Sequence, residues 1–363
     1  MGRLYFKYTQ RQTTWRKRLI SNPSGFFCTK NIRRKTHIMR LTETIPSNEE
    51  MEQAIRFKTY LNYLVCISDF LGDIYSEPTR LIAPVIQSRA FQNIQGGRCF
   101  DTERLAQLFR NAWFTEIQMS ISAQYEEFVS YSNHWIPVQA YYATYLALRA
   151  YFTSSGQDIG REHTANLKAI GEEIQRRPKL FPQPWSAVCV DNPGSSSPQF
   201  RNLPNDVTIS PISSLTSSWR VSFWDSYAKF LKTTRQRILE KQCEDWKITK
   251  SRKRVSSTIK QQFIQNLSPT TIFHCLYRLR LRSNYADADS FLLSVHGSSD
   301  GAAFHSALRK ICWGSLLVLE LLTSRYVGKK EFDNIVNSFQ RYERRGVSDD
   351  LIGLRWRSMR TLW

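Results

Sequence analysis

Hydrophobic positions recur at steps of three and four residues along most of the chain, and this spacing predicts α-helices. The first helix is predicted over residues 48–72, where the pattern comprises Ile55, Phe57, Tyr60, Leu61, Leu64 and Ile67. Ser47-Asn-Glu-Glu50 precedes it as a capping box, in which the serine caps a free N–H and the glutamate reaches back. Gly96-Gly97 marks a break. Asp101 is then placed to cap a second helix that carries Leu105, Leu108, Phe109, Trp113 and Ile117.

Two further helices are predicted before residue 178. Pro137 suits the first turn of a helix because its φ angle is already fixed at a helical value. The apolar stripe of this helix comprises Val138, Tyr141, Tyr142, Tyr145, Leu148 and Phe152, and Gly156 ends it. The next helix is predicted over residues 161–177 and stops before Pro178.

Residues 178–217 differ in composition, since they contain seven prolines and the run Ser195-Ser196-Ser197. A stretch of this length without helical periodicity is typical of a linker or an inserted loop. Short extended pieces are expected at 188–190 and 207–209. The sequence therefore predicts an N-terminal helical part (46–177), a Pro/Ser-rich loop or linker (178–217) and a C-terminal helical part (218–363).

Helical periodicity resumes at Trp219, with Phe223, Trp224, Tyr227, Phe230, Leu231 and Ile238 on one broad face. Ser268-Pro269 is a helix-start signal, and Leu267 and Ile272 are spaced for a hydrophobic staple across that start. Later helices are predicted near 301–325 and 329–343. The predicted fold class is mainly α, built as one or two helical bundles with the Pro/Ser-rich loop between the helical halves.

The most apolar run, residues 312–322, is shorter than the ~20 residues needed to cross a bilayer, and it contains Glu320. It is expected to be a buried core helix, and no membrane association is predicted. The seven cysteines are scattered, without a C-x-x-C pair. An odd, dispersed set of this kind indicates reduced thiols that fill space in a cytoplasmic protein.

The net charge of +20, from 51 Lys and Arg against 31 Asp and Glu, is concentrated in two segments. Residues 1–40 hold eleven basic and no acidic residues, and residues 229–260 hold eleven basic and three acidic ones. Residues 1–45 are expected to form a basic, disordered N-terminal segment. Three interpretations stay open for it: an arm that neutralises phosphates, an organellar transit peptide, or a mistranslated leader with the true start at Met39 or Met51 rather than Met1.

The second basic segment contains the cluster Lys250-Ser-Arg-Lys-Arg254. Lys250, Arg252, Lys253 and Arg254 are candidates for phosphate contacts in a nucleic-acid complex. The alternative is a solvated loop between two helices.

Common catalytic and cofactor motifs are absent. The chain has no phosphate-binding Gly-x-x-x-x-Gly-Lys-Ser/Thr loop, dinucleotide fingerprint, His-Glu-x-x-His or Gly-x-Ser-x-Gly sequence. None of the six histidines has another histidine three or four residues away. No catalytic residue, metal site or cofactor is therefore predicted. His134 and His163 each stand near a predicted helix start, where a histidine acts as a proton donor or simply as a surface or capping residue.

The most distinctive polar pattern interrupts the helix predicted from Ser268. On one face of that helix, polar residues replace the apolar ones for two turns, in the order Ile272, Leu276, Arg280, Asn284, Asp287 and Phe291. One interpretation is a polar pocket in which Arg280 holds a phosphate or carboxylate and Asn284 and Asp287 orient it. The other is an internal Arg–Asp bridge between helices, with Arg282 and Asp289 as a further structural pair.

The tyrosine-rich segment 137–151, then Gly156, then His163-Thr-Ala-Asn-Leu167 resembles the paired helices of HEPN-type domains. The segment 279–291 is similar to a later helix of some of these proteins. The resemblance implies a helical bundle of a family that often cleaves RNA or binds nucleotides and is common in toxin and phage-defence systems. Its catalytic signature, an Arg and a His with four to six residues between them, is absent here. The resemblance therefore implies a divergent member of this family, which binds RNA or a nucleotide without cleaving it.

Three functions follow as hypotheses. The first is a HEPN-like protein that associates with RNA or a nucleotide in a prokaryotic defence, toxin or regulatory system. The second is a helical scaffold that docks a protein partner or forms a homodimer. The third is a divergent ribonuclease whose site combines Arg280 and Asp287 with a distant histidine, so enzymatic activity is left open.

Overall fold

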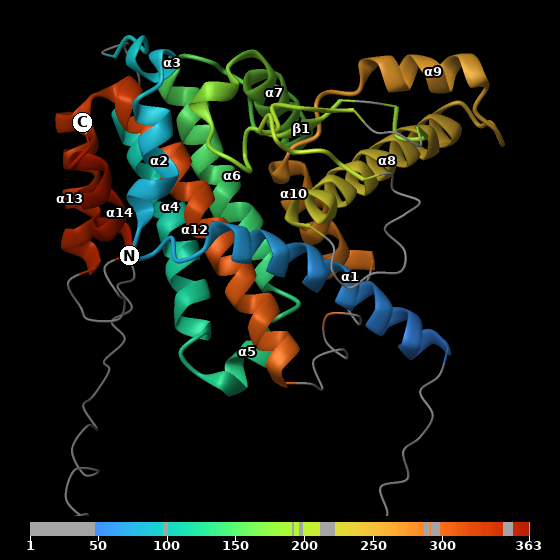
Figure 1. The fold of residues 1–363 in the computed structure, drawn as a ribbon, viewed down its shortest axis with the longest axis horizontal. Coiled ribbons are helices and arrows are strands. Elements are labelled where there is room, and N and C mark those ends of the chain that lie inside the picture. The colour runs from blue at the N-terminus through green and yellow to red at the C-terminus, as the bar shows by residue number, and fades with distance from the viewer. Residues whose placement is uncertain are drawn as a thin grey trace, which may run out of the picture. The chain divides into compact units, whose positions relative to one another are not determined.

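The computed structural model describes residues 48–96, 101–190, 192–195, 199–210, 222–286, 291, 298–343 and 351–362 (Figure 1). The chain divides between Ile45 and Pro46, and residues from Pro46 onward form one unit. The basic N-terminal segment 1–45 lies outside the described residues. Within the described part, regular structure is helical except for two strands of two residues each, which confirms the prediction of a mainly-α fold.

Four of the seven helices described before residue 178 follow the predicted hydrophobic periodicity, and three shorter ones are additional. The seven are α1 (Asn48–Leu71), α2 (Pro78–Ile86), α3 (Arg89–Gln92), α4 (Thr102–Ser122), α5 (Glu126–Ser132), α6 (Ile136–Ser154) and α7 (His163–Arg176). The predicted cap of α4 is confirmed, since the Asp101 carboxylate accepts the Arg104 N–H at 2.9 Å. Gly156 follows α6 with φ +75°, a left-handed conformation that suits glycine at a helix end. Ser47, the predicted cap of the first helix, lies outside the described residues.

The later elements are the 3₁₀ turn η1 (Pro178–Leu180), the strands β1 (Val188–Cys189) and β2 (Phe200–Arg201), and the helices α8 (Phe223–Thr249), α9 (Ser257–Asn266), α10 (Ile272–Leu281), α12 (Ser298–Val327), α13 (Lys329–Glu343) and α14 (Leu351–Arg360). The helices predicted near 301–325 and 329–343 are confirmed as α12 and α13.

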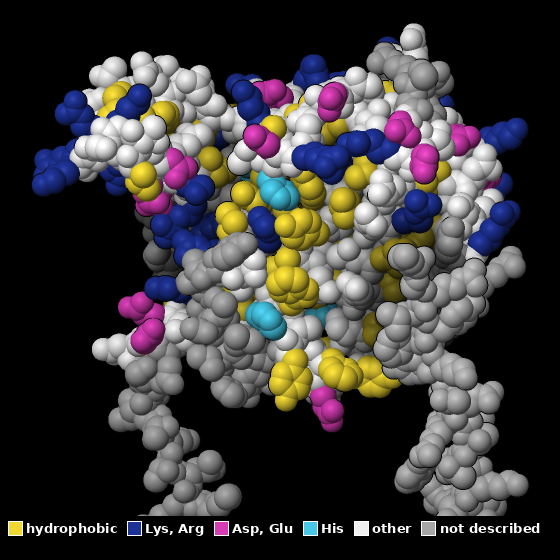
Figure 2. Space-filling view, turned by 180° about the vertical axis from the view of Figure 1, so that it is seen from behind, with side chains coloured by type: hydrophobic (Ala, Val, Ile, Leu, Met, Phe, Trp, Pro, Cys, Tyr) yellow, Lys and Arg dark blue, Asp and Glu magenta, His cyan; other side chains and the backbone are white. Residues whose placement is uncertain are grey.

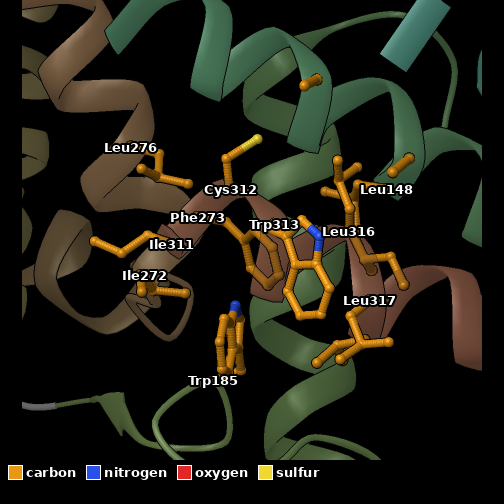
Figure 3. Packing of buried hydrophobic residues seen from close by; sticks show 14 of the residues in the cluster. Leu148, Trp185, Ile272, Phe273, Leu276, Ile311, Cys312, Trp313, Leu316 and Leu317 are labelled. Atoms are coloured by element: carbon orange, nitrogen blue, oxygen red, sulfur yellow. The ribbon is translucent and has the colours of Figure 1, made fainter. Parts of the chain in front are cut away.

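The centre of the core is α12, whose residues 311–324 are all buried. It packs against α1, α4 and α6. Figure 3 shows Trp313, Leu316 and Leu317 of this helix facing Leu148 and Trp185. The run 312–322 is therefore the buried core helix that its sequence predicts. Among the described helices, none has the length and apolarity required to span a membrane.

The described part of the Pro/Ser-rich stretch contributes to this core. Leu180, Phe181 and Trp185 are buried, and Trp185 Nε1 donates to Ser315 Oγ at 3.0 Å. Gly314 provides the space for the indole ring, because a Cβ there would lie 2.7 Å from it. Strand β1 confirms the extended piece predicted at 188–190. The second strand, however, is Phe200–Arg201 and not 207–209, because the Val207 N–H bonds to the Pro204 carbonyl in a turn.

The helix predicted to start at Ser268-Pro269 begins at Ile272 instead. Tertiary pairing causes this difference: the N–H groups of Thr270 and Cys189 each donate to the other residue's carbonyl, at 2.9 and 3.0 Å, which keeps the segment before α10 extended. Thr271 is the N-cap and forms a capping box with His274. The staple predicted between Leu267 and Ile272 is therefore wrong, since Thr270 is the residue that precedes the cap.

The helix predicted to continue from 268 to 289 also changes its geometry at residue 282. A π-helical turn follows α10 over Arg282–Ala286. Its hydrogen bonds span five residues rather than four, so the face shared by regularly spaced side chains is not continued. Phe291 is helical and buried, as its place in the pattern predicts, whereas Asp287 and Asp289 lie outside the described residues.

A buried ion triad joins α14 to the core. The Arg355 guanidinium donates to both carboxylate oxygens of Glu116, at 2.6 and 2.8 Å, and also to Glu320, at 2.8 and 2.9 Å. Trp113 Nε1 donates to Glu320 as well, at 2.7 Å. Burial raises the pKa of Glu320, and the positive charge of Arg355 opposes that rise. All three charged side chains are almost fully buried, so each depends on the others for compensation.

None of the five described cysteines, Cys66, Cys189, Cys243, Cys275 and Cys312, is in a disulfide bond. The last two and Cys189 are buried in the core. Burial raises the pKa of Cys275 to about 12, so this thiol stays protonated and packs as a small apolar group. Cys28 and Cys99 lie outside the described residues.

Candidate functional site

Three segments that are distant in sequence meet around His163. Helix α6 contributes Tyr141, Tyr142 and Tyr145, α7 begins with His163, and α10 contributes Tyr277 and Arg280. We call these six residues the tyrosine–arginine cluster. Figure 2 shows a face of the molecule on which hydrophobic side chains, tyrosines included, gather around histidines, with Lys and Arg beside them.

The turn between α6 and α7 brings His163 to the tyrosines. Helix α6 is buried on most of its circumference, so residues that reach the surface from it form one narrow stripe. After Gly156 the chain reverses, and the Tyr145 hydroxyl donates to the Arg161 carbonyl at 2.7 Å. The Asn166 amide donates to the Glu162 carbonyl at 2.8 Å, which supports the first turn of α7. His163 is thereby held over the middle of α6.

His163 is half-buried and surrounded by rings. Its Nδ1 lies 2.8 Å from the Tyr141 hydroxyl, and its ring centre is 4.4 Å from that of Tyr145 and 5.8 Å from that of Tyr277. Burial lowers the pKa of His163, and the positive charges of Arg280 and Arg149 lower it further. The imidazole is therefore neutral at pH 7. Burial also raises the pKa of Tyr141 well above its usual value, so this phenol keeps its proton.

Arg280 lies against three of the tyrosine rings. Its guanidinium carbon is 5.1 Å from the ring centre of Tyr142 and within 6 Å of those of Tyr141 and Tyr277, which is the range of cation–π contacts. Nη2 donates to the Tyr142 hydroxyl at 3.0 Å. The Nε atom is buried and has no hydrogen-bond partner. Among the described residues, no carboxylate pairs with Arg280.

The other residues of the predicted polar pocket are less well placed. Asn284 lies in the π-helical turn, is half-buried and forms no side-chain hydrogen bond with a described residue. Asp287 is outside the described part of the chain, so neither the pocket nor the Arg–Asp bridge is tested at that position. The structure thus brings Arg280 to the cluster and leaves Asn284 outside it.

A cleft of about 670 Å³ between α7, α8 and α10 adjoins the cluster and shares Tyr277 with it. Arg278 lines this cleft and donates to Thr233 Oγ1 and Thr234 Oγ1 at 2.8 and 3.2 Å. Like Arg280, it has a buried Nε without a partner and no carboxylate partner among the described residues. The rim carries both signs of charge, as in the pair Arg237–Glu240. His274 also lines the cleft, and burial, together with Arg235, lowers its pKa to about 3.

The basic cluster Lys250, Arg252, Lys253 and Arg254 lies in the loop between α8 and α9. All four side chains are exposed, and none of them lines the cleft. This location agrees with the interpretation as a solvated loop, while a role in phosphate contact stays a prediction. His134 precedes α6 but does not cap it, since Trp135 is the N-cap residue.

The sequence pattern missed most of the cluster. The periodicity places Tyr141, Tyr142 and Tyr145 in an apolar stripe and gives no signal at Tyr277. One signal was present: three tyrosines within five positions of a helix imply hydroxyl groups that need polar partners. Among the described residues, no group of three or more His, Cys, Asp or Glu side chains is arranged to hold a metal ion. No family model, curated protein or solved structure matches the chain.

Proposed function

We propose that the protein binds RNA or a nucleotide at the tyrosine–arginine cluster. The observation that carries the proposal is Arg280: a partly buried guanidinium among tyrosines, with an unpartnered Nε–H and no described carboxylate beside it. The outer nitrogens of the guanidinium donate one hydrogen bond, to Tyr142, so further N–H groups are left for the charge-assisted hydrogen bonds that a phosphate oxygen accepts. Aromatic rings next to a cation are the combination that stacks bases and holds the phosphate between them.

The HEPN resemblance belongs to the same proposal. It rests on segments of α6 and α7 and on residues 279–291, which begin in the last turn of α10 and include Arg280. With it we propose a role in a prokaryotic defence, toxin or regulatory system, in which the protein acts by binding. The observation on Arg280 stands independently of the resemblance.

The test is fluorescence anisotropy with labelled RNA, DNA and nucleotides at about 50 and 200 mM salt. Arg280→Gln is compared with Arg56→Gln, which removes the same charge from an exposed residue paired with Glu52 on α1. We expect Arg280→Gln to weaken binding about tenfold or more, and Arg56→Gln to leave it near the wild-type value. Equal losses in both variants would assign the binding to net charge and contradict the proposal. A chain lacking residues 1–38 reports how much the basic arm adds.

A divergent ribonuclease is the second candidate, favoured by the proximity of a neutral histidine to Arg280. In this reaction His163 takes the proton of a ribose 2′-hydroxyl, and the 2′-oxygen attacks the adjacent phosphorus. The bond from phosphorus to the 5′-oxygen breaks, that oxygen takes a proton from water, and Arg280 stabilises the phosphate charge. Products would carry 2′,3′-cyclic phosphate and 5′-hydroxyl ends.

Incubation of RNA and of its 2′-deoxy analogue with the purified protein tests this second candidate. Cleavage of RNA alone, lost in His163→Gln while binding persists, would support it. Intact RNA after prolonged incubation with wild-type protein would leave binding as the function.

A further inference from the structure

A second aromatic surface lies at the start of α6. It is a groove of about 560 Å³ between the end of α4, the short helix α5 and the first turn of α6. Four aromatic residues expose 46–75% of their surface there: Tyr125, Phe128, Tyr131 and Trp135. We call these four residues and the groove that they line the aromatic groove. Large exposed aromatic patches of this kind mark binding sites in soluble proteins.

A half-buried stripe of α6 connects this groove to the tyrosine–arginine cluster. From Trp135 onward, the side chains of α6 that are not buried include Gln139, Tyr142, Leu146 and Arg149, spaced by three or four residues on one face. Gln139 lines the aromatic groove, and Tyr142 belongs to the cluster one turn later. At about 1.5 Å per residue, the stripe from Trp135 to Arg149 is about 21 Å long.

We propose that the aromatic groove, the stripe of α6 and the tyrosine–arginine cluster form one continuous track for a single-stranded oligonucleotide. This inference rests on the proposed function and specifies its substrate class. A stacked strand advances about 3.4 Å per nucleotide, so a track of about 21 Å accommodates about six nucleotides, and fewer where the strand is extended.

Positive charge is concentrated at one end of the track, and this distribution supports a single-stranded oligonucleotide as its ligand. At the cluster end, Arg280 and Arg149 supply positive charge, and neither forms an ion pair with a described residue. The groove end has no Lys or Arg among its lining residues, so it offers ring faces rather than charge. Bases are uncharged and stack on such rings without sequence preference, whereas a duplex keeps its bases stacked on one another.

The polar groups in the groove are better matched to nucleotide bases than to the apolar surface of a protein partner. Gln118 and Gln139 carry amides, which pair with base edges, and Ile121 is the single aliphatic residue among the lining residues. His134 lines the groove as well, and its Nδ1 is buried with no hydrogen-bond partner among the described residues.

The experiment measures the affinity of the full chain for oligouridylates of one, three, six and ten nucleotides at fixed salt. We expect the affinity to rise with length up to about six nucleotides and then to level off. Tyr131→Ala and Trp135→Ala should each weaken the binding of the six-nucleotide oligomer about tenfold, in line with the contribution of one stacked base. The same variants should leave binding of the mononucleotide unchanged, because that ligand occupies the cluster alone.

Two control variants distinguish a loss of affinity caused by lost stacking from one caused by impaired folding. Tyr131→Phe keeps the ring and should retain wild-type affinity, and Tyr131 is 75% exposed, so its replacement leaves the core intact. Phe114→Ala removes an exposed ring that contacts Phe339 outside the groove, and it should not change binding.

The outcomes distinguish this inference from the proposed function. Affinity that is independent of length, or that is lost in Arg280→Gln but unchanged in Tyr131→Ala and Trp135→Ala, would overturn the track and leave the binding site at the cluster. Groove variants that abolish self-association in sedimentation, without changing oligonucleotide affinity, would overturn it in favour of a protein interface. No binding of any nucleotide or oligomer by wild-type protein would overturn both.

Discussion

His163 Nδ1 and the Tyr141 hydroxyl are 2.8 Å apart, and this contact fixes the first residue of α7 to the middle of α6. It orients the imidazole between Tyr145 and Tyr277, where the positive charges of Arg280 and Arg149 act on it. Burial and these charges favour the neutral ring. The histidine is thus an uncharged member of a cationic site, and a bound anion would reverse that preference.

The first prediction is that oligonucleotide binding strengthens as the pH falls below neutrality. Because the pKa of His163 lies below its usual value of 6.5, the ring is neutral at pH 7 and gains a positive charge as the pH falls through that lowered pKa. One further charge near a phosphate is worth about 1 kcal/mol at a half-exposed site, or about a fivefold gain in affinity. Anisotropy titrations between pH 5 and 8 measure it, with His163→Gln expected to give a flatter profile.

The second prediction concerns the buried ion triad. Arg355→Met should reduce the free energy of unfolding by about 3–5 kcal/mol, because it leaves Glu116 and Glu320 buried without a compensating charge. Urea unfolding monitored by circular dichroism measures the loss. Adding Glu116→Gln and Glu320→Gln to Arg355→Met should recover much of it, since both amides are neutral and the one at position 320 can still accept the Trp113 N–H. A triple variant no more stable than Arg355→Met would contradict this account of the triad.

The third prediction is a loss of stability in mild acid. Burial, together with the positive charge of Arg309, lowers the pKa of His305 to about 4, from 6.5. Between these values the unfolded chain binds a proton that the folded chain does not, so the free energy of unfolding falls as the pH falls. His305 alone changes the free energy of unfolding by at most about 1.4 kcal/mol per pH unit.

His274 contributes with the same sign down to a pKa of about 3, so the full effect exceeds that of His305 alone. Urea unfolding between pH 4 and 7 measures the dependence in the wild type and in His305→Gln. The glutamine keeps a group that can bond to Ser122 but does not titrate, so its curve should be shallower by up to the slope given above. Parallel curves would show that His305 is not the titrating group.

The fourth prediction uses the close approach of α7 to the segment before α10. A Cβ added at Gly171 would overlap the carbonyl oxygen of Pro269. Glycine to alanine within a helix ordinarily stabilises by up to about 1 kcal/mol, but here backbone must shift, and we expect Gly171→Ala to destabilise by about 1–3 kcal/mol. Thermal unfolding checks the sign. A rise in melting temperature would indicate that α7 and the chain at Pro269 separate freely.

The long helices were predictable because their apolar periodicity extends over several turns, as in α1, α6 and α13. The periodicity does not predict the short helices α2, α3, α5, α9 and α14, since helices of four to ten residues hold too few turns for a pattern to emerge. The start of α10 was placed at Ser268 because Ser-Pro is a sound local signal. Pairing with Cys189, a residue about eighty positions earlier, overrides it.

The candidate site was predictable in part for the same reason. Arg280 was identified because it interrupts an apolar stripe, which is a local pattern. Its ring partners Tyr141 and Tyr142 come from another helix, and nothing local links them to α10. The contact of Arg280 with tyrosines of α6 therefore needed the fold, while the choice between an ion pair with Asp287 and an anion site stays a prediction.

The separation of Arg355 from Glu116 by 239 residues also bears on how the chain is made. At the usual speed of translation of about 5–20 residues per second, Arg355 is added roughly 10–50 s after Glu116. Until then Glu116 has no cation to pair with in the nascent chain, and Glu320 is added only 35 residues before Arg355. The last packing step must therefore wait until α14 has left the ribosome, so the core cannot close in its final form while the last described helix is still being made.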